Sequence, residues 1–264
     1  MSALEVIILG LLQGFTEFLP VSSSGHIVLL SLALGKESET NLLFTLLLHT
    51  ATAASIVWVY KDTLWGLCKG LFSFSAFNAS HRYVLLLLLS AVPIGAMGLL
   101  FKDVITDIFE GNMLFLGCAF CFTGLCLELS RRAVYKGRGI GFWSSLCIGL
   151  AQVCAIFPGV SRSGVTISCA LLMGLKKKEA AGFSFLMGLV PILGAQFIAL
   201  LDVLGNSSSS LGFSWLWLLG MFGAFVSGVW ACRRMVAWVQ KGFWQYFRIY
   251  CFGLGVLCLC IYLF

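Results

Sequence analysis

The sequence predicts an all-α polytopic membrane protein in which one integral membrane domain takes up residues 1–264. Composition is the first reason, because 60% of the residues are hydrophobic, 11% are charged and the mean hydropathy is +1.00. Such a chain lacks the polar side chains needed to cover a water-soluble globule. The second reason is a series of long apolar stretches. The third is a pair of related segments that interrupt such stretches with proline, glycine and serine.

Six apolar stretches approach the roughly 20 residues that an α-helix needs to cross a bilayer. They run from Leu42 to Tyr60, Tyr83 to Phe101, Met113 to Leu127, Phe183 to Leu201, Leu211 to Cys232 and Ile249 to Phe264. The shorter stretches reach spanning length when flanking residues are counted. We therefore expect about six spanning helices.

Basic side chains concentrate in four connecting segments, 61–82, 131–138, 176–179 and 233–248. An excess of Lys and Arg marks the cytoplasmic side of a membrane protein. The segments around 36–39, 102–110 and 202 are acidic or polar instead. We expect the first group inside and the second group outside.

Two further regions, Met1 to Leu34 and Ile140 to Leu175, are apolar at both ends but broken in the middle. The second region lies between two basic segments, so it must cross the membrane an even number of times. Its break at Pro158-Gly159 favours a re-entrant helix hairpin over two complete spans. The same reasoning makes the first region a hairpin that enters from the outside. Non-helical backbone at this depth is tolerated where it is buried in protein or lines a wet cavity.

The two broken regions are copies of one pattern. A constant shift of 139 positions takes Gly10 to Gly149 and gives eight identities within 16 residues. Because one copy enters from the outside and the other from the inside, we interpret the halves, about 1–130 and 140–264, as an inverted-topology repeat. Sites in such folds lie at the repeat interface, so the two breaks should meet.

The second copy has the residues of an anion site. Helix starts offer free backbone N–H groups and the positive end of a dipole, which suit phosphate. Arg162 adds a guanidinium that can hold two oxygens at once. The hydroxyls of Ser161, Ser163 and Thr166 could bind the same anion or could simply cap the helix.

The first copy places an acid, a histidine and three hydroxyls in apolar surroundings. Ionisable groups at membrane depth are costly, about 2.5–3.5 kcal/mol on insertion scales, and mark functional sites. The residues are Gln13, Glu17, Ser22, Ser23, Ser24 and His26. Glu17 can lie beside phosphates if it is protonated or shares a divalent cation, for which Mg²⁺ is suited. His26 could donate a proton, attack as a nucleophile or be structural, and Ser23 is the other candidate nucleophile, with Glu17 or His26 as its base.

At these residues the chain resembles the BacA/UppP family of undecaprenyl-diphosphate phosphatases. The family signature joins (E/Q)xxxE to PxSS(S/T)GH and adds a second stretch, PGxSRSxxT. Here Gln13 to Glu17 fits the first element, Pro20 to His26 continues it, and Pro158 to Thr166 fits the last without a gap. The similarity extends over essentially the whole chain.

The resemblance implies removal of the terminal phosphate from a C55 polyprenyl diphosphate, which regenerates the carrier lipid for peptidoglycan synthesis and confers bacitracin resistance. It implies that Glu17 and His26 are catalytic, that Ser23 is a nucleophile candidate, and that Arg162 acts on the diphosphate. The candidate substrate-binding residues are Gln13, Ser22, Ser24, Ser161, Ser163 and Thr166. Many relatives carry glutamate in place of Gln13, so this chain has one candidate metal ligand fewer and Glu17 is left for a divalent cation, Mg²⁺ or Ca²⁺.

The implied setting is a bacterial cytoplasmic (inner) membrane, with several passes and a site that opens to the outer, periplasmic side. The implied partners are a lipid diphosphate and the bilayer, without nucleic acid; the oligomeric state stays open, with a homodimer as one option. His49 could line the cavity or pack as a polar residue inside its helix.

Two other functions remain open from the residues alone. Inverted repeats with broken helices also occur in secondary transporters, which predicts a carrier or flippase for the polyprenyl phosphate. A structural membrane protein with serine-rich packing is the third interpretation. Phosphate release from a polyprenyl diphosphate in detergent, where no gradient exists, separates the enzyme from the other two.

Overall fold

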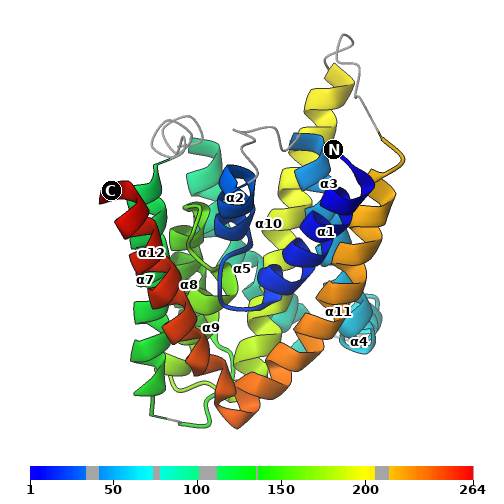
Figure 1. Ribbon diagram of the computed structural model, residues 1–264. Coiled ribbons are helices and arrows are strands. Elements are labelled where there is room, and N and C mark those ends of the chain that lie inside the picture. The colour runs from blue at the N-terminus through cyan, green and yellow to red at the C-terminus, as the bar shows by residue number, and fades with distance from the viewer. Residues whose placement is uncertain (34–41, 74–77, 101–111, 135, 206–213, 264) are drawn as a thin grey trace.

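The computed structural model describes residues 1–264 apart from 34–41, 74–77, 101–111, 135, 206–213 and 264. In this part of the chain all regular elements are helices, apart from an isolated bridge between Arg138 and Leu175 (Figure 1). The elements are α1 (Ala3–Phe18), α2 (Ser23–Ala33), α3 (Leu42–Val59), α4 (Lys61–Leu71), α5 (Ala79–Leu100), α7 (Met113–Arg131), α8 (Phe142–Val153), η1 (Cys154–Ile156), α9 (Arg162–Leu172), α10 (Lys177–Gly205), α11 (Trp217–Lys241), η2 (Phe243–Tyr246) and α12 (Phe247–Leu263). The all-α prediction is confirmed.

Four helical segments of the described chain are long and apolar enough to cross a membrane: α5, α7, α10 up to Ala199, and η2 with α12. The pair α3 and α4 passes as a fifth, although it is bent by 77°. The expected number was about six. The difference lies partly in α11, which is 25 residues long but has Arg233, Arg234 and Lys241 in its second half. A multi-pass membrane protein is confirmed.

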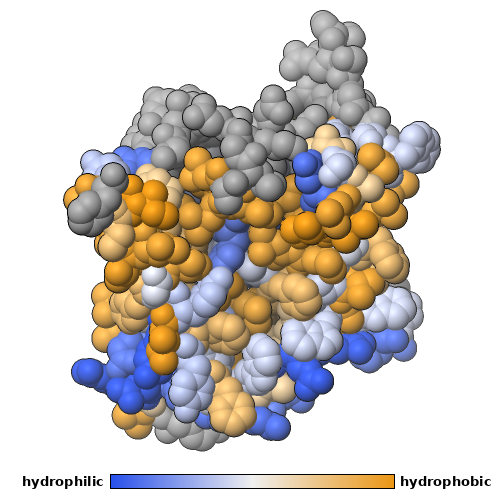
Figure 2. Space-filling model, in the orientation of Figure 1, coloured by the Kyte–Doolittle hydropathy of each residue, from blue (hydrophilic) through white to orange (hydrophobic). Residues whose placement is uncertain are grey.

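The outer surface agrees with a membrane setting. Large apolar side chains are exposed on the flanks, among them Val92 (63%), Phe222 (69%) and Ile249 (64%). Figure 2 shows hydrophobic residues over most of the flank and hydrophilic residues gathered along its lower edge, where Figure 1 places α4 and the ends of α7 and α11. The basic connecting segments thus lie at one end of the molecule, as the charge pattern predicts.

Both predicted breaks are present. The first hairpin consists of α1 and α2 with residues 19–22 between them, and Figure 1 shows both of its outer ends near the N-terminus. The second consists of α8, η1 and α9, and its two outer ends meet where Arg138 pairs with Leu175. Each hairpin therefore enters and leaves the molecule at one end.

The two hairpins are seated in similar ways, because α1 packs on α11 and α8 packs on α5. Small residues allow these backbones to approach closely. A Cβ atom at Gly10 would lie 2.8 Å from the Gly220 Cα, and one at Gly149 would lie 2.9 Å from the Ser90 Cα. Gly10 and Gly149 are equivalent positions of the sequence repeat. This shared packing supports the inverted repeat, which stays a prediction.

Candidate active site

The first break is built around Ser22, whose φ of 69° lies in the left-handed region that side chains other than glycine rarely adopt. The helix α1 ends at Phe18, so Glu17 lies in its last turn, and α2 begins at Ser23. The Ser22 Oγ accepts a hydrogen bond from the Gly25 N–H at 3.3 Å, which satisfies a free donor at the start of α2. Unusual backbone of this kind persists where its surroundings hold it, often at functional sites.

The second break turns at Gly159, which has a φ of +90° and lies against α7. A Cβ atom there would be 2.8 Å from both the Leu116 Cδ1 and the Ala119 Cβ, so glycine is required. Ser161 then caps α9 by accepting a hydrogen bond from the Gly164 N–H at 3.1 Å. The capping interpretation is thus confirmed for Ser161.

The two breaks meet, as the repeat predicts. Arg162 Nη2 donates to Glu17 Oε1 at 2.5 Å, although 145 positions separate them in the sequence. Ser163 Oγ donates to the Leu19 carbonyl at 3.2 Å, which joins the start of α9 to the end of α1. The side chains of Glu17 and Arg162 are only 8% and 16% exposed. Removing either partner of such a pair leaves a buried charge uncompensated, at a cost of about 3–5 kcal/mol.

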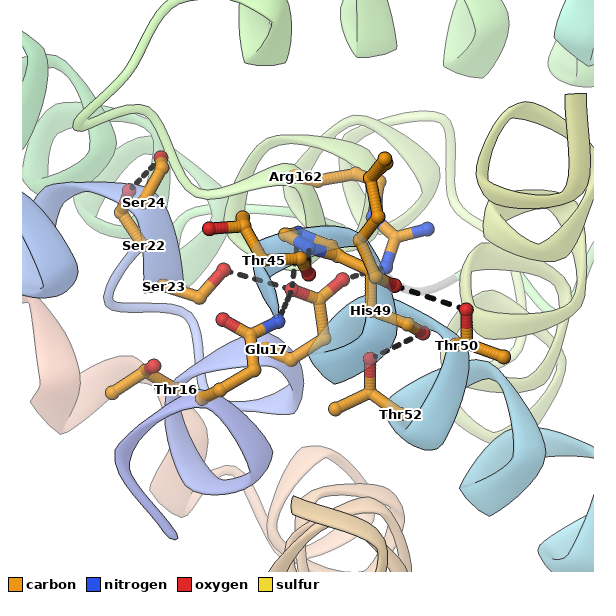
Figure 3. Close-up of polar contacts among 12 residues, drawn as sticks. Thr16, Glu17, Ser22, Ser23, Ser24, Thr45, His49, Thr50, Thr52 and Arg162 are labelled. Carbon is orange, nitrogen blue, oxygen red and sulfur yellow. Dashed lines mark hydrogen bonds and ion pairs between the residues drawn. The ribbon is translucent and has the colours of Figure 1, made fainter. Parts of the chain in front are cut away.

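Glu17 is the centre of the polar contacts (Figure 3). Its second oxygen, Oε2, accepts hydrogen bonds from Ser23 Oγ at 2.8 Å and from Gln13 Nε2 at 3.1 Å. The same oxygen lies 4.0 Å from His49 Nε2. A serine hydroxyl that donates to a buried carboxylate has the arrangement of a nucleophile beside its base.

These groups line a cavity of about 400 Å³. Its polar wall consists of Thr16, Glu17, Ser22, Ser23, Ser24, Thr45, His49, Ser161, Arg162 and Gln196. Its apolar wall includes Ile94, Ile156, Pro158, Val160, Pro191 and Ile192. A cavity with a cationic, hydroxyl-rich wall and an apolar wall suits a ligand that has an anionic head and a hydrocarbon body.

Two buried polar atoms at this place have no partner in the described part of the chain, Arg162 Nη1 and Gln13 Oε1. The Arg162 guanidinium lies against Gly188, where a Cβ atom would overlap it. Glycine at position 188 therefore makes room for the arginine head. Buried donors without a partner are rare in native proteins, and a catalytic role is one reason for them.

The structure brings together most of the predicted site residues. Glu17, Ser22, Ser23, Ser24, Ser161 and Arg162 line the cavity, and Gln13 contacts Glu17 behind it. Ser163 and Thr166 are buried beside the wall, where Thr166 Oγ1 donates to the Arg162 carbonyl at 2.7 Å. Their roles in binding stay predictions.

His26 is not brought to Glu17. Its Nδ1 lies 2.7 Å from the Ser22 carbonyl and its Nε2 lies 2.7 Å from the Tyr250 hydroxyl. Its ring packs edge-on against Phe120 and it is absent from the cavity wall. A catalytic role for His26 stays a prediction, whereas its contacts are those of a residue that holds the Ser22 turn.

The sequence did not decide whether His49 lines the cavity, and it did not single out Thr45, Gln196 or Tyr250. In the structure His49, Thr45 and Gln196 line the cavity, and Tyr250 holds His26. The available signal for Thr45 and His49 was their polarity inside the apolar stretch of α3, four residues apart and therefore on one helical face. Nothing comparable distinguished Gln196 or Tyr250.

The donor set does not fit a divalent ion held by the protein. Glu17 is the one carboxylate that the described residues contribute to the cavity wall, and its oxygens already accept from Arg162, Ser23 and Gln13. Among the described residues no group of three or more His, Cys, Asp or Glu side chains could hold a metal. A cation would need oxygen ligands from elsewhere. Glu17 as a metal ligand stays a prediction.

The fold and the site define a class: a multi-pass, all-α membrane protein with an anion-binding cavity where two broken helix hairpins meet. The family model described as "Bacitracin resistance protein BacA" matches residues 6–257. The chain is 43% identical over 256 residues to the undecaprenyl-diphosphatase of Bacteroides fragilis, with 96% of each chain covered. It is 42% identical over 260 residues to that of Parabacteroides distasonis and 34% identical over 268 residues to that of Alkaliphilus metalliredigens, with 97% of each chain covered in both cases. The chain belongs to the BacA family.

Proposed function

We propose that this protein is an undecaprenyl-diphosphate phosphatase that hydrolyses the terminal phosphate of a C55 polyprenyl diphosphate. The product is the carrier lipid phosphate used in peptidoglycan synthesis, and its regeneration confers bacitracin resistance. The observation that carries the proposal is the contact of Arg162 and Ser23 with the two oxygens of Glu17. It joins a cation, a hydroxyl nucleophile and a base in one cavity.

In the first step, Ser23 Oγ attacks the terminal phosphorus. Glu17 Oε2, which already accepts the Ser23 hydrogen bond, takes the hydroxyl proton. The bond from the terminal phosphorus to the bridging oxygen breaks, and its electron pair leaves with the polyprenyl monophosphate. This step yields a phosphoserine at Ser23 and a protonated Glu17.

Arg162 stabilises the charge that this displacement develops. Its Nη2 holds Glu17, and Arg162 lines the cavity, so the guanidinium can bind phosphate oxygens while it still touches the carboxylate. Ser22 and Ser24 line the same cavity and add two hydroxyl donors to its wall. Ile94, Ile156 and Ile192 exclude water from one side of the cavity.

The membrane setting completes the proposal. The basic segments lie at the end of the molecule opposite to the N-terminal hairpin. By the positive-inside rule that end is cytoplasmic, which puts the α1–α2 hairpin on the outer side of a bacterial inner membrane. We propose that the cavity opens to this outer, periplasmic side and that a divalent cation, where required, enters with the diphosphate.

The test is phosphate release from C55 polyprenyl diphosphate by the purified protein in detergent. Glu17→Ala and Arg162→Ala should abolish release, because each removes a group that no neighbour replaces. Release that persists in both variants would reject this site. A protein that binds the lipid but releases no phosphate without a membrane gradient would be a transporter; the curated relatives reported above carry diphosphatase names, which favours the enzyme.

A further inference from the structure

The two histidines near the site differ in what their ring nitrogens can do. At His26 both nitrogens are occupied, by the Ser22 carbonyl and the Tyr250 hydroxyl. A carbonyl oxygen only accepts, so His26 Nδ1 carries the proton and its Nε2 accepts from Tyr250. His26 therefore has no free lone pair for chemistry.

His49 has one. Its Nδ1 lies 2.9 Å from the Thr45 carbonyl, so this nitrogen carries the proton. Its Nε2 keeps the lone pair, lines the cavity, and makes no hydrogen bond to a described residue. The Thr52 hydroxyl donates to the His49 carbonyl at 2.9 Å, and Gln196 Nε2 donates to the Leu46 carbonyl at 2.8 Å, so this turn of α3 is held in place.

The reaction proposed above needs a second base. After the first step Glu17 holds the proton taken from Ser23, and that proton must return to Ser23 Oγ when the phosphoserine breaks. The attacking water must therefore lose its proton to another group. Of the titratable side chains that line the described cavity, Glu17, His49 and Arg162, His49 alone has a lone pair available at that moment.

We propose that His49 is a catalytic residue, the general base of the second half-reaction, and this inference rests on the proposed function. Its Nε2 takes a proton from water while the water oxygen forms a bond to the phosphorus of phosphoserine. The bond from phosphorus to Ser23 Oγ breaks, and Ser23 Oγ recovers its proton from Glu17. Inorganic phosphate leaves, and His49 releases its proton to the solvent in the cavity.

The geometry supports this order of events. His49 Nε2 and Ser23 Oγ approach the same carboxylate oxygen, Glu17 Oε2, at 4.0 Å and 2.8 Å. A phosphorus bonded to Ser23 Oγ would therefore lie in the part of the cavity that His49 faces, as Figure 3 shows for the two side chains around Glu17.

The experiment uses a polyprenyl diphosphate labelled at its terminal phosphate, with acid quenching and measurement of label bound to the protein. In His49→Gln and His49→Ala, steady-state release should fall by about 100-fold or more, the usual contribution of a general base. The labelled phosphoserine should rise to about one per protein, because the first step does not use His49. Free imidazole should restore turnover in His49→Ala, whose cavity has space for it.

Three controls separate the outcomes. His81→Gln alters the third histidine, in the first turn of α5 and outside the cavity wall, and should leave both readouts unchanged. The double variant Ser23→Ala/His49→Gln should trap no label. His26→Gln should lower thermal stability without trapping label.

The failures are distinguishable. A wild-type protein that releases no phosphate would reject the proposed function itself. A wild-type protein that turns over, together with His49 variants that trap no phosphoserine or keep full turnover, would overturn the role of His49 alone.

Discussion

The two hairpin breaks share a backbone device but differ in the side chains that it presents. Both copies end a helix, turn through a left-handed residue and begin a second helix with hydroxyls, Ser22 and Ser24 in one and Ser161 and Ser163 in the other. At the unmatched positions the first copy carries Ser23 where the second carries Arg162. The repeat therefore supplies two helix starts, and its divergence supplies the chemistry.

Glu17 and His26 also occur in the first copy alone. Shifting Glu17 by the repeat leads to Ile156, and shifting His26 leads to Val165. The negative charge and the nucleophile thus belong to the first break, and the positive charge belongs to the second. Because Glu17 and Arg162 neutralise each other across the interface, each break supplies what the other lacks. The site therefore exists only where the two halves meet.

The largest expected effect comes from removing the nucleophile of the first break. Ser23→Ala should lower phosphate release by at least about 1,000-fold while the pair of Glu17 and Arg162 persists. The matched control is Ser24→Ala, one residue further along the same wall. Ser24 contacts Ser22 and not Glu17, so phosphate release by Ser24→Ala should fall by no more than about tenfold, the value of one hydrogen bond. Equal losses in both variants would contradict a nucleophilic role for Ser23.

The second break is tested by replacing Arg162 with lysine, which has the same charge but a different shape. Arg162→Lys keeps the charge but loses the planar guanidinium, whose several N–H groups can hold Glu17 and a phosphate oxygen at the same time. We expect kcat/KM to fall by about 100-fold, with a much smaller change in melting temperature. Arg248→Lys, at the partly buried pair with Glu128 outside the cavity, is the control and should keep its activity. Unchanged turnover in Arg162→Lys would rule out the bidentate role.

The sequence predicted more of the fold than of the site. Bilayer-length apolar stretches and the two motifs were enough for an all-α membrane protein with two broken hairpins, because both features are local patterns of residue type. The bend that turns α3 into α4 was not predicted, since the chain at Tyr60 has neither proline nor glycine to mark it. The four or five spans found among the described residues come near the expected six, and α11 fails the same length and composition test because its second half carries Arg233, Arg234 and Lys241.

For the site, the sequence predicted the meeting of Glu17 with Arg162 because the repeat required the breaks to converge. It could not predict which way each ring points. His26 lies in the motif yet turns to Tyr250, more than 200 positions away, whereas His49 lies outside the motifs and faces the cavity. Such orientations depend on contacts between distant helices, which one sequence does not reveal.

The backbone of the two breaks gives a smaller, purely structural effect. Gly159→Ala places a Cβ on a residue with a φ of +90° and against Leu116 and Ala119, so the variant should lose about 2 kcal/mol of stability. The control is Gly95→Ala in α5, where a Cβ would meet nothing within 4 Å and should be neutral or mildly stabilising. Melting in detergent measures both. In the first break Ser22 has a φ of 69° although it is not glycine. A Gly159→Ala protein that melts like the wild type would mean that the second break, too, accepts a side chain at its left-handed residue.

The smallest effect is expected for metal binding without substrate. The first break offers a divalent ion only Glu17, and the second break already neutralises that carboxylate through Arg162. Addition of Mg²⁺ or Ca²⁺ to about 10 mM should therefore leave the melting temperature of the substrate-free protein unchanged, since a ligand stabilises only what it binds. Any requirement for a cation should appear in KM for the diphosphate, whose oxygens would supply the missing ligands. The contrary result would be a clear rise in melting temperature without substrate that a chelator reverses and that Glu17→Ala lacks. It would show that the first break holds an ion by itself, although Arg162 of the second break neutralises Glu17.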